Sequence, residues 1–79
     1  MNPGQEKFFN FIIDRVQADK RKEAEALLDE SFGRQADGTF DAEYLKSFIA
    51  RMTTLLKPES IEEVKAVMTQ FGPGHTQPQ

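Results

Sequence analysis

The chain has 79 residues, which is the size of one small domain, and it contains no cysteine. Disulfide bonds, thiolate nucleophiles and sulfur-ligated metal sites are therefore excluded, and the core has to come from apolar side chains, among them seven Phe. Hydrophobic residues make up 38% of the chain and charged residues 29%, and the net charge of −3 argues against the basic surface of a nucleic-acid-binding protein.

The opening segment MNPGQEKFF lacks the basic stretch and long apolar run of a secretory leader. No apolar run elsewhere is long enough to cross a bilayer. We therefore expect an intracellular, soluble protein of the cytoplasm that makes no contact with a membrane.

The first half of the chain has the apolar spacing of two helices. The first is expected from about Pro3 to Gln17 with Asn2 as its cap, and the second from about Lys20 to Ala36. The spacing almost continues from one to the other, so a single long helix is the alternative. We favour a break at Ala18–Asp19, with Asp19 as the second cap, because a long lone helix would expose much of its apolar stripe. The inward positions of the second helix are Ala24, Leu27, Leu28, Ser31 and Phe32.

The second half predicts two further helices. The third has one unbroken apolar stripe, made of Leu45, Phe48, Ile49, Met52, Leu55 and Leu56. The fourth begins at Pro58 or at Ser60, where Ser60 and Glu63 have the spacing of a capping box, and ends before Gly72. Its apolar positions are Ile61, Val64, Val67, Met68 and Phe71. We find no strand pattern and no internal repeat.

These segments predict an all-α fold, a small bundle of three to four short antiparallel helices with a disordered C-terminal tail. Residues 1–71 form a single helical domain, in which the first, third and fourth helices supply most of the core. The tail, residues 72–79 (GPGHTQPQ), is predicted to be disordered because its Gly, Pro and Gln residues have nothing to bury.

The stretch QADGTFDAEYL, Gln35 to Leu45, resembles part of the calcium-binding loop of an EF-hand. With Gly38 at the sixth of the twelve loop positions, Asp37 occupies position five and Asp41 position nine. Phe32 lies where the entering helix of such a loop carries an aromatic residue. The resemblance covers only about a dozen residues.

The ligand set for calcium is incomplete in this stretch. Positions one and three of such a loop carry carboxylates and position twelve carries a bidentate Glu, but here these positions hold Gly33, Gln35 and Tyr44. We therefore interpret the stretch as a turn, in which Gly38 takes a positive φ and Asp41 caps the third helix. A degenerate EF-hand-like helix pair without calcium is kept as an alternative.

Lys20, Arg21 and Lys22 form a basic cluster that makes a nucleic-acid-associated helical module a second hypothesis. Glu23 and Glu25 follow at once and neutralise its field. We therefore interpret the cluster as the solvated start of a helix, and nucleic-acid binding as the weaker hypothesis.

Catalytic chemistry lacks its usual residues in this chain. The single histidine, His75, lies in the predicted tail, where no packing would hold it against a substrate. Glu30 and Arg34 have the spacing of a helical ion pair, which is a surface feature. The other carboxylates considered also lie on polar helix faces: Glu25, Asp29, Glu59, Glu62 and Glu63. We expect no enzyme, no cofactor and no bound metal.

The first helix is more apolar than the others. At about 100° per residue, its apolar residues cover about 200° of the circumference, against about 120° for the third and fourth helices. These residues are Phe8, Phe9, Phe11, Ile12, Ile13 and Val16. A small bundle cannot surround a helix on all sides, so we predict that Phe8, Phe11 and Ile12 face a protein partner, most simply a second copy of the chain.

The alternative is that Phe11 packs near Phe40 or against the last helix and completes an ordinary core. With the partner hypothesis, the sequence favours a small non-enzymatic helical protein that acts through protein–protein interaction or self-association, as an adaptor or regulator.

Overall fold

The computed structural model describes residues 2–71, and the side chains of residues 2–69. This part of the chain forms four α-helices and no strand, which confirms the predicted all-α bundle. The elements are α1 (Pro3–Ile13), the 3-10 turn η1 (Ala18–Lys20), α2 (Arg21–Asp37), α3 (Ala42–Thr53), the 3-10 turn η2 (Pro58–Ser60) and α4 (Ile61–Phe71). The predicted disorder of residues 72–79 lies outside the described residues. None of the described helices is both long enough and apolar enough to cross a membrane.

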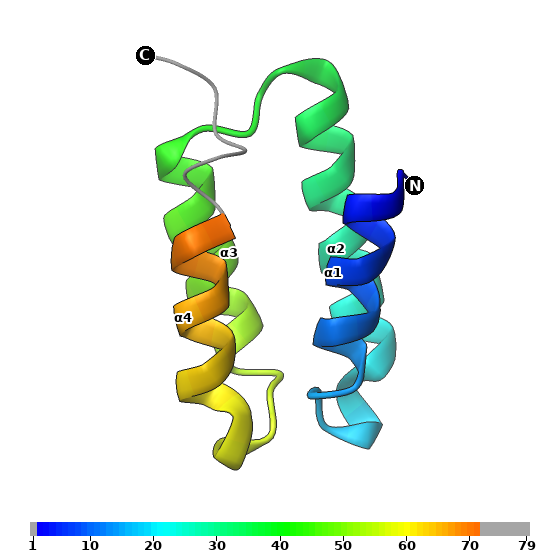
Figure 1. Cartoon of the computed structure of the whole chain (residues 1–79), viewed down its shortest axis with the longest axis vertical. Coiled ribbons are helices and arrows are strands. Elements are labelled where there is room, and N and C mark those ends of the chain that lie inside the picture. Colours follow the sequence, from blue (N-terminus) through cyan, green and yellow to red (C-terminus); the bar gives the residue numbers. More distant parts are fainter. Residues whose placement is uncertain (1, 72–79) are drawn as a thin grey trace.

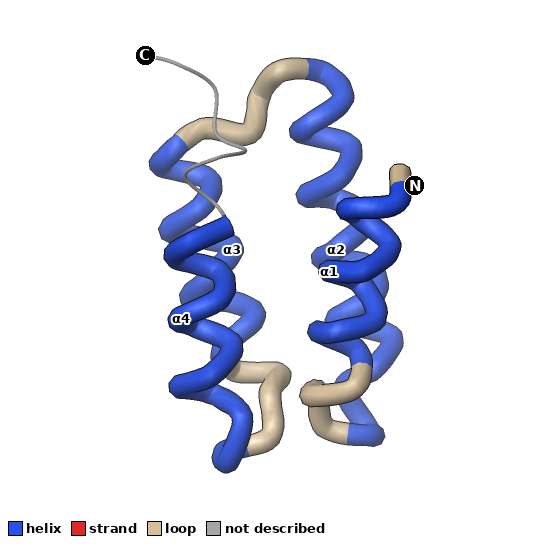
Figure 2. The backbone as a smooth tube through the Cα atoms, viewed as in Figure 1, coloured by secondary structure: helices blue, strands red, loops and turns tan. Residues whose placement is uncertain are grey.

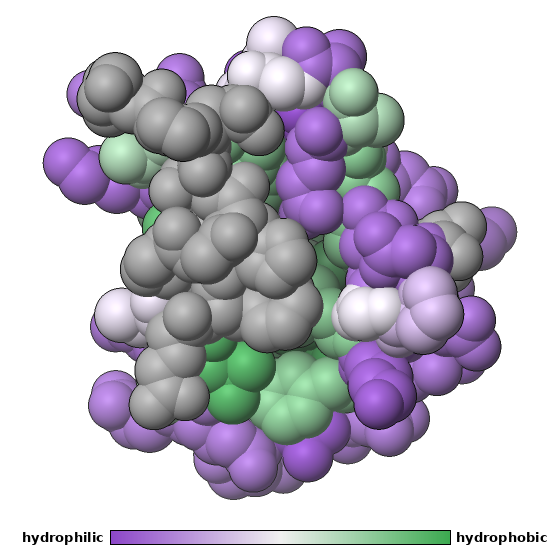
Figure 3. Space-filling model, turned by 45° about the horizontal axis from the view of Figure 1, so that its top comes forward, coloured by the Kyte–Doolittle hydropathy of each residue, from purple (hydrophilic) through white to green (hydrophobic). Residues whose placement is uncertain are grey.

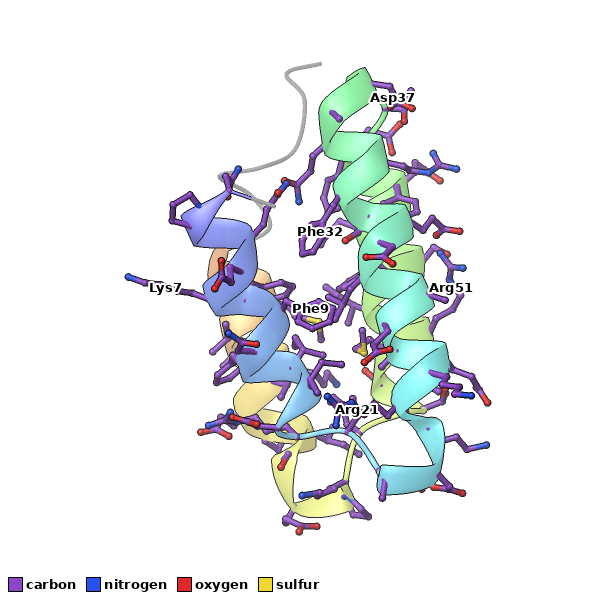
Figure 4. The ribbon with its side chains drawn as sticks, turned by 90° about the vertical axis from the view of Figure 1, so that its right-hand side faces the viewer. Lys7, Phe9, Arg21, Phe32, Asp37 and Arg51 are labelled. Atoms are coloured by element: carbon purple, nitrogen blue, oxygen red, sulfur yellow. The ribbon has the colours of Figure 1, made fainter. Side chains whose placement is uncertain are left out.

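The four helices are arranged as two antiparallel hairpins that lie side by side (Figure 1). One hairpin is α1 with α2, and the other is α3 with α4. Both hairpin turns lie at the same end of the bundle, and the connection from α2 to α3 crosses the opposite end. In Figure 1, α1 and α4 form the front layer, and α2 and α3 form the layer behind it. In Figure 4, which is turned by 90°, the same two layers lie side by side.

The first two helices are separate, as predicted, but their ends differ from the prediction. Asn2 caps α1 in a capping box: its side chain accepts from the Gln5 N–H at 2.7 Å, and the Gln5 side chain accepts from the Asn2 N–H at 3.2 Å. The helix ends at Ile13 rather than near Gln17. Asp19 lies inside η1 and is not the cap of α2, whose N-cap is Lys20 without a side-chain hydrogen bond.

The start of α4 also differs from the predicted capping box. The helix begins at Ile61, after η2, and the Ser60 N–H donates to the Lys57 carbonyl at 2.9 Å. Among the described residues, no side-chain hydrogen bond joins Ser60 to Glu63. In both hairpins a 3-10 turn leads into the second helix, and this turn takes the place of the side-chain cap that the sequence predicted.

The turn between α2 and α3 has the conformation predicted for it. Gly38 ends α2 with φ 80°, which is the left-handed conformation that glycine adopts without strain. The Asp37 carboxylate accepts from the Thr39 N–H at 3.1 Å. The Asp41 carboxylate accepts from the Tyr44 N–H at 2.8 Å and caps α3. The two Asp carboxylates of the EF-hand-like stretch, Asp37 and Asp41, are therefore used to shape the turn.

The two hairpins repeat each other, which the sequence analysis did not detect. Residues 11–20 and 51–60 pass through the same conformations in the same order, so that residue n corresponds to residue n + 40. The hairpin turns meet in an antiparallel bridge between Val16 and Leu56, which are counterparts in this numbering. The turns face each other at one end of the tube drawn in Figure 2.

The hydrogen bonds of the bridge follow the same symmetry. The Gln17 N–H donates to the Leu55 carbonyl at 2.9 Å, and the Lys57 N–H donates to the Arg15 carbonyl at 2.9 Å. Each bond is the counterpart of the other, so a pseudo-twofold axis passes through the bridge. The repeat escaped the sequence analysis because it preserves apolar character rather than identity: most of the paired core positions hold different residues.

The core is built from these paired positions. Four pairs of counterparts are buried on both sides: Ile12 with Met52, Val16 with Leu56, Ala24 with Val64, and Leu28 with Met68. The prediction that the first, third and fourth helices supply most of the core is wrong in one respect. Within α1 only Ile12 is buried, whereas α2 buries Ala24, Leu27, Leu28 and Ser31. The pseudo-twofold accounts for the buried residues of α2, because α2 occupies the same place in its hairpin as α4.

Candidate interaction surface of α1

The structure separates the three residues that were predicted to face a partner. Ile12 is 0% exposed, so it belongs to the core and cannot contact a partner; this part of the prediction is corrected. Phe8 is half-buried and lies beside Phe48, with 6.5 Å between the ring centroids. Phe11 is also half-buried, and it packs against the edge of the core.

Phe11 is covered on one side by Arg15, one helical turn further along. The Arg15 guanidinium carbon lies 3.9 Å from the centroid of the Phe11 ring, and its Nη1 donates to the Phe11 carbonyl at 2.9 Å. The Arg15 Nε also donates to the Glu63 carboxylate on α4 at 2.7 Å. α4 therefore holds the guanidinium over the ring, which agrees in part with the alternative that Phe11 packs toward the last helix.

The repeat shows which apolar residues of α1 exceed the needs of the fold. Phe8 corresponds to Phe48, Phe9 to Ile49 and Ile12 to Met52, so these positions are apolar in both hairpins. Phe11 corresponds instead to Arg51, whose side chain is 48% exposed. Ile13 corresponds to Thr53. The fold therefore places position 11 at its surface, and a phenylalanine there is not required by the core.

The opposite flank of α1 faces α2. Figure 4 shows Phe9 directed into the space between α1 and α2, with Phe32 of α2 on the other side of that space. Both rings are half-buried and pack against the core. Lys7 points away from the bundle in the same view. The apolar arc of α1 thus has a buried centre at Ile12 and two half-exposed flanks.

Figure 3 shows the apolar and polar side chains of one face of the molecule. Hydrophobic side chains lie mainly near the middle of the coloured surface, and hydrophilic side chains lie along most of its outer edge. Neither the cover of Phe11 by Arg15 nor the pairing of Arg15 with Glu63 was predicted from the sequence. The spacing of Arg15 from Phe11 could have suggested a contact, but Glu63 is brought near only by the pairing of the two hairpins.

A second surface feature lies between α2 and the end of α3. It is an open groove of about 410 Å³, lined by Glu23, Ala26, Leu27, Glu30, Arg51, Thr54 and Leu55. The pseudo-twofold relates this groove to the side of the molecule between α1 and α4. Phe11 and Arg15 stand there in the places of Arg51 and Leu55. The two sides therefore have the same backbone frame and different side chains.

Glu30 connects α2 to α3 beside this groove. Its carboxylate accepts from the Tyr44 hydroxyl and from the Arg51 Nη2, each at 2.6 Å. These two hydrogen bonds lower the pKa of Glu30, and the bond from Tyr44 has the larger effect. Burial, followed by the bond to Glu30, raises the pKa of Tyr44 far above its usual value. The carboxylate is therefore held in its ionised form, and the phenol is held in its neutral form.

The predicted ion pair between Glu30 and Arg34 does not form. Glu30 turns instead toward α3, and Arg34 stacks on the Tyr44 ring, with its guanidinium carbon 4.4 Å from the ring centroid. Glu30 bonds to α3 rather than to Arg34 because Arg51 and Tyr44 together offer its carboxylate two hydrogen-bond donors. Within the described residues, no cluster of three or more His, Cys, Asp or Glu could hold a metal ion.

The basic cluster at the start of α2 has acidic partners. Lys20 lies 3.9 Å from the Glu23 carboxylate, and the Arg21 Nε donates to the Glu25 carboxylate at 3.2 Å. Lys22 is exposed. Two of the three positive charges are thus paired within α2 and its preceding turn, so the cluster presents little net positive field.

Comparisons with family models, curated proteins and solved structures find no match to this chain. Its function therefore has to be argued from its own surface.

Proposed function

We propose that this protein is a small non-enzymatic protein that works in the cytoplasm as an adaptor or regulator, by binding another protein through α1. The observation that supports the proposal is the position of Phe11. It is an aromatic residue at a site where the repeated half of the same fold carries an exposed arginine. Aromatic residues are enriched at protein interfaces because one rigid ring buries a large apolar area.

Phe8 extends the surface around Phe11. It lies one turn earlier on the same side of α1 and packs only partly against the core, whereas Phe9 and Ile13 belong to the opposite flank of the helix. Nucleic-acid binding by Lys20, Arg21 and Lys22 has less support, because two of these residues already pair with glutamates. A protein partner is therefore the hypothesis that this surface favours.

A pull-down with matched variants tests the proposal. The bait is the full chain as wild type, as Phe11→Ser and as Asn10→Ser, where Asn10 is an exposed polar residue beside Phe11. Phe, Asn and Ser have similar helix propensities, so neither substitution should disturb α1, and circular dichroism checks this. We expect proteins that are retained by the wild type and by Asn10→Ser but lost with Phe11→Ser. Identical retained sets for all three baits would contradict the proposal.

A further inference from the structure

We infer that the partner of α1 is a second copy of this chain, bound so that the two α1 helices pack antiparallel. The inference rests on the proposed interaction role of α1, and it adds the identity of the partner and its orientation. It is carried by the charges that flank Phe11 on the exposed face of the helix.

Lys7, Phe11 and Asp14 share one face of α1. Their spacings of four and three residues place them within about 60° of one another on a helix. Asp14 continues this face although it caps the helix, because its φ of −64° and ψ of −18° are helical and its N–H donates to the Asn10 carbonyl at 3.1 Å. Lys7 and Asp14 are both exposed, and Figure 4 shows Lys7 directed outward. Among the described residues, neither has an ion-pair partner.

This arrangement is complementary to itself. If two α1 helices pack antiparallel about a twofold axis near Phe11, Lys7 of each copy lies opposite Asp14 of the other. The two Phe11 rings then lie near the centre of the contact. Gly4, which is exposed on the same side of α1, adds no side chain that would hold the helices apart. This surface favours a second copy as the partner, because each copy supplies an acidic residue opposite the other's Lys7 and a basic residue opposite the other's Asp14.

The contact is small, and the association should depend on concentration. A helix of 11 residues is about 16 Å long, so the buried area falls at the low end for specific protein interfaces. Arg15 can stay over Phe11 and bonded to Glu63 while the exposed side of the ring meets the other copy. The dimer therefore needs no rearrangement of the fold described above.

Charge-reversal variants test the pairing directly. Sedimentation equilibrium of the wild-type chain over a wide range of concentrations should show a monomer–dimer equilibrium. Lys7→Glu and Asp14→Lys, each alone, place like charges at both ends of the contact and should weaken dimerisation about tenfold or more. An equimolar mixture of the two variants restores both opposite-charge pairs and should form a heterodimer of wild-type strength. The double variant should also dimerise like the wild type.

Both substitutions are compatible with the helix. Lys7→Glu places a negative charge in the first half of α1, and Asp14→Lys places a positive charge at its end, which is the favourable direction for each. Circular dichroism of the single variants should match the wild type. Phe11→Ser should dimerise more weakly than Asn10→Ser, because it removes the apolar centre of the contact.

Two results would overturn the inference. One is a wild-type chain that stays monomeric at every concentration. The other is a dimer whose dissociation constant is unchanged by Lys7→Glu and Asp14→Lys. The proposed function would survive either result if the pull-down still loses proteins with Phe11→Ser. If the pull-down is also insensitive to Phe11, both proposals fail.

Discussion

Arg15 decides how much of the Phe11 ring is open to a partner. Its guanidinium lies over the ring, bonds to the backbone of the same turn and pairs with Glu63 on α4. The counterpart position, Leu55, is 8% exposed and belongs to the core. At the scale of single residues, the two halves of the fold therefore differ in order: Phe11 and Arg15 in one half stand where the other half has Arg51 and Leu55. This difference moves an aromatic ring toward the surface on one side only.

Glu30 supplies a prediction at the same scale. Its pKa is lowered by hydrogen bonds from Tyr44 and Arg51, so the folded state favours the ionised carboxylate. This contribution to stability is present above the ordinary pKa of Glu and is lost as the pH falls through the lowered pKa. We expect Glu30→Gln to lower the free energy of unfolding by about 0.5–1 kcal/mol near neutral pH, because the carboxylate is partly exposed and its interactions are screened.

The pH dependence identifies this effect. Between about pH 6 and about pH 3, the wild type should lose more stability than Glu30→Gln, so that the two unfolding curves converge in acid. Tyr44→Phe removes one of the two hydrogen bonds, so its loss of stability should lie between those of the wild type and Glu30→Gln. Denaturant unfolding at several pH values measures all three chains. Parallel losses for the wild type and Glu30→Gln would show that the two bonds contribute nothing to stability.

At the scale of elements, local chemistry determined where some helices begin and end. The other helix ends were determined by the pairing of the two hairpins. The caps at Asn2 and Asp41 and the stop at Gly38 follow from short-range patterns, and each was predicted. The early end of α1 was not predicted. Residues 15–17 leave the helix because the Arg15 carbonyl bonds to Lys57, and the Gln17 N–H bonds to Leu55, in the other hairpin.

The two glycines of α2 provide a matched test of this element. Gly38 has a positive φ at the end of the helix, whereas Gly33 lies in its interior; neither position would crowd an added Cβ. We expect Gly38→Ala to lower the free energy of unfolding by about 1 kcal/mol, through backbone strain alone. Gly33→Ala should raise it by about 0.5–1 kcal/mol, because alanine favours the helix. Thermal unfolding measures both changes, and equal effects of the same sign would contradict the assigned backbone conformations.

At the scale of the whole molecule, the two hairpins depend on each other. Their paired core residues, such as Ile12 with Met52 and Leu28 with Met68, are buried only because the hairpins lie side by side. Each hairpin has fewer than about 40 residues, which is below the usual limit for folding alone. The turns at one end are joined by the bridge, and the other end is closed by the short α2–α3 connection.

This arrangement predicts complementation between the halves. A fragment of residues 1–38 and a fragment of residues 39–79 should each show little helix alone, because each would expose its apolar stripe. An equimolar mixture should gain helical circular dichroism through the shared core. The substitution Leu56→Ala in the second fragment should weaken this gain strongly, since Leu56 is 1% exposed and a buried Leu→Ala change costs about 2–5 kcal/mol. Full helicity in either fragment by itself would contradict the prediction.

The sequence by itself determined the all-α class, a count of three to four helices, the favoured break between the first two helices and the glycine turn. Apolar period, capping residues and positive φ act over a few neighbouring residues, so they can be recognised without knowing the fold. Only the tertiary structure decided that the hairpins are counterparts, that Ile12 is buried and that Phe11 lies under Arg15, which pairs with Glu63. The 200° apolar arc of the first helix could not distinguish its buried centre from its exposed flanks. That distinction depends on which neighbours the bridge between Val16 and Leu56 brings to α1.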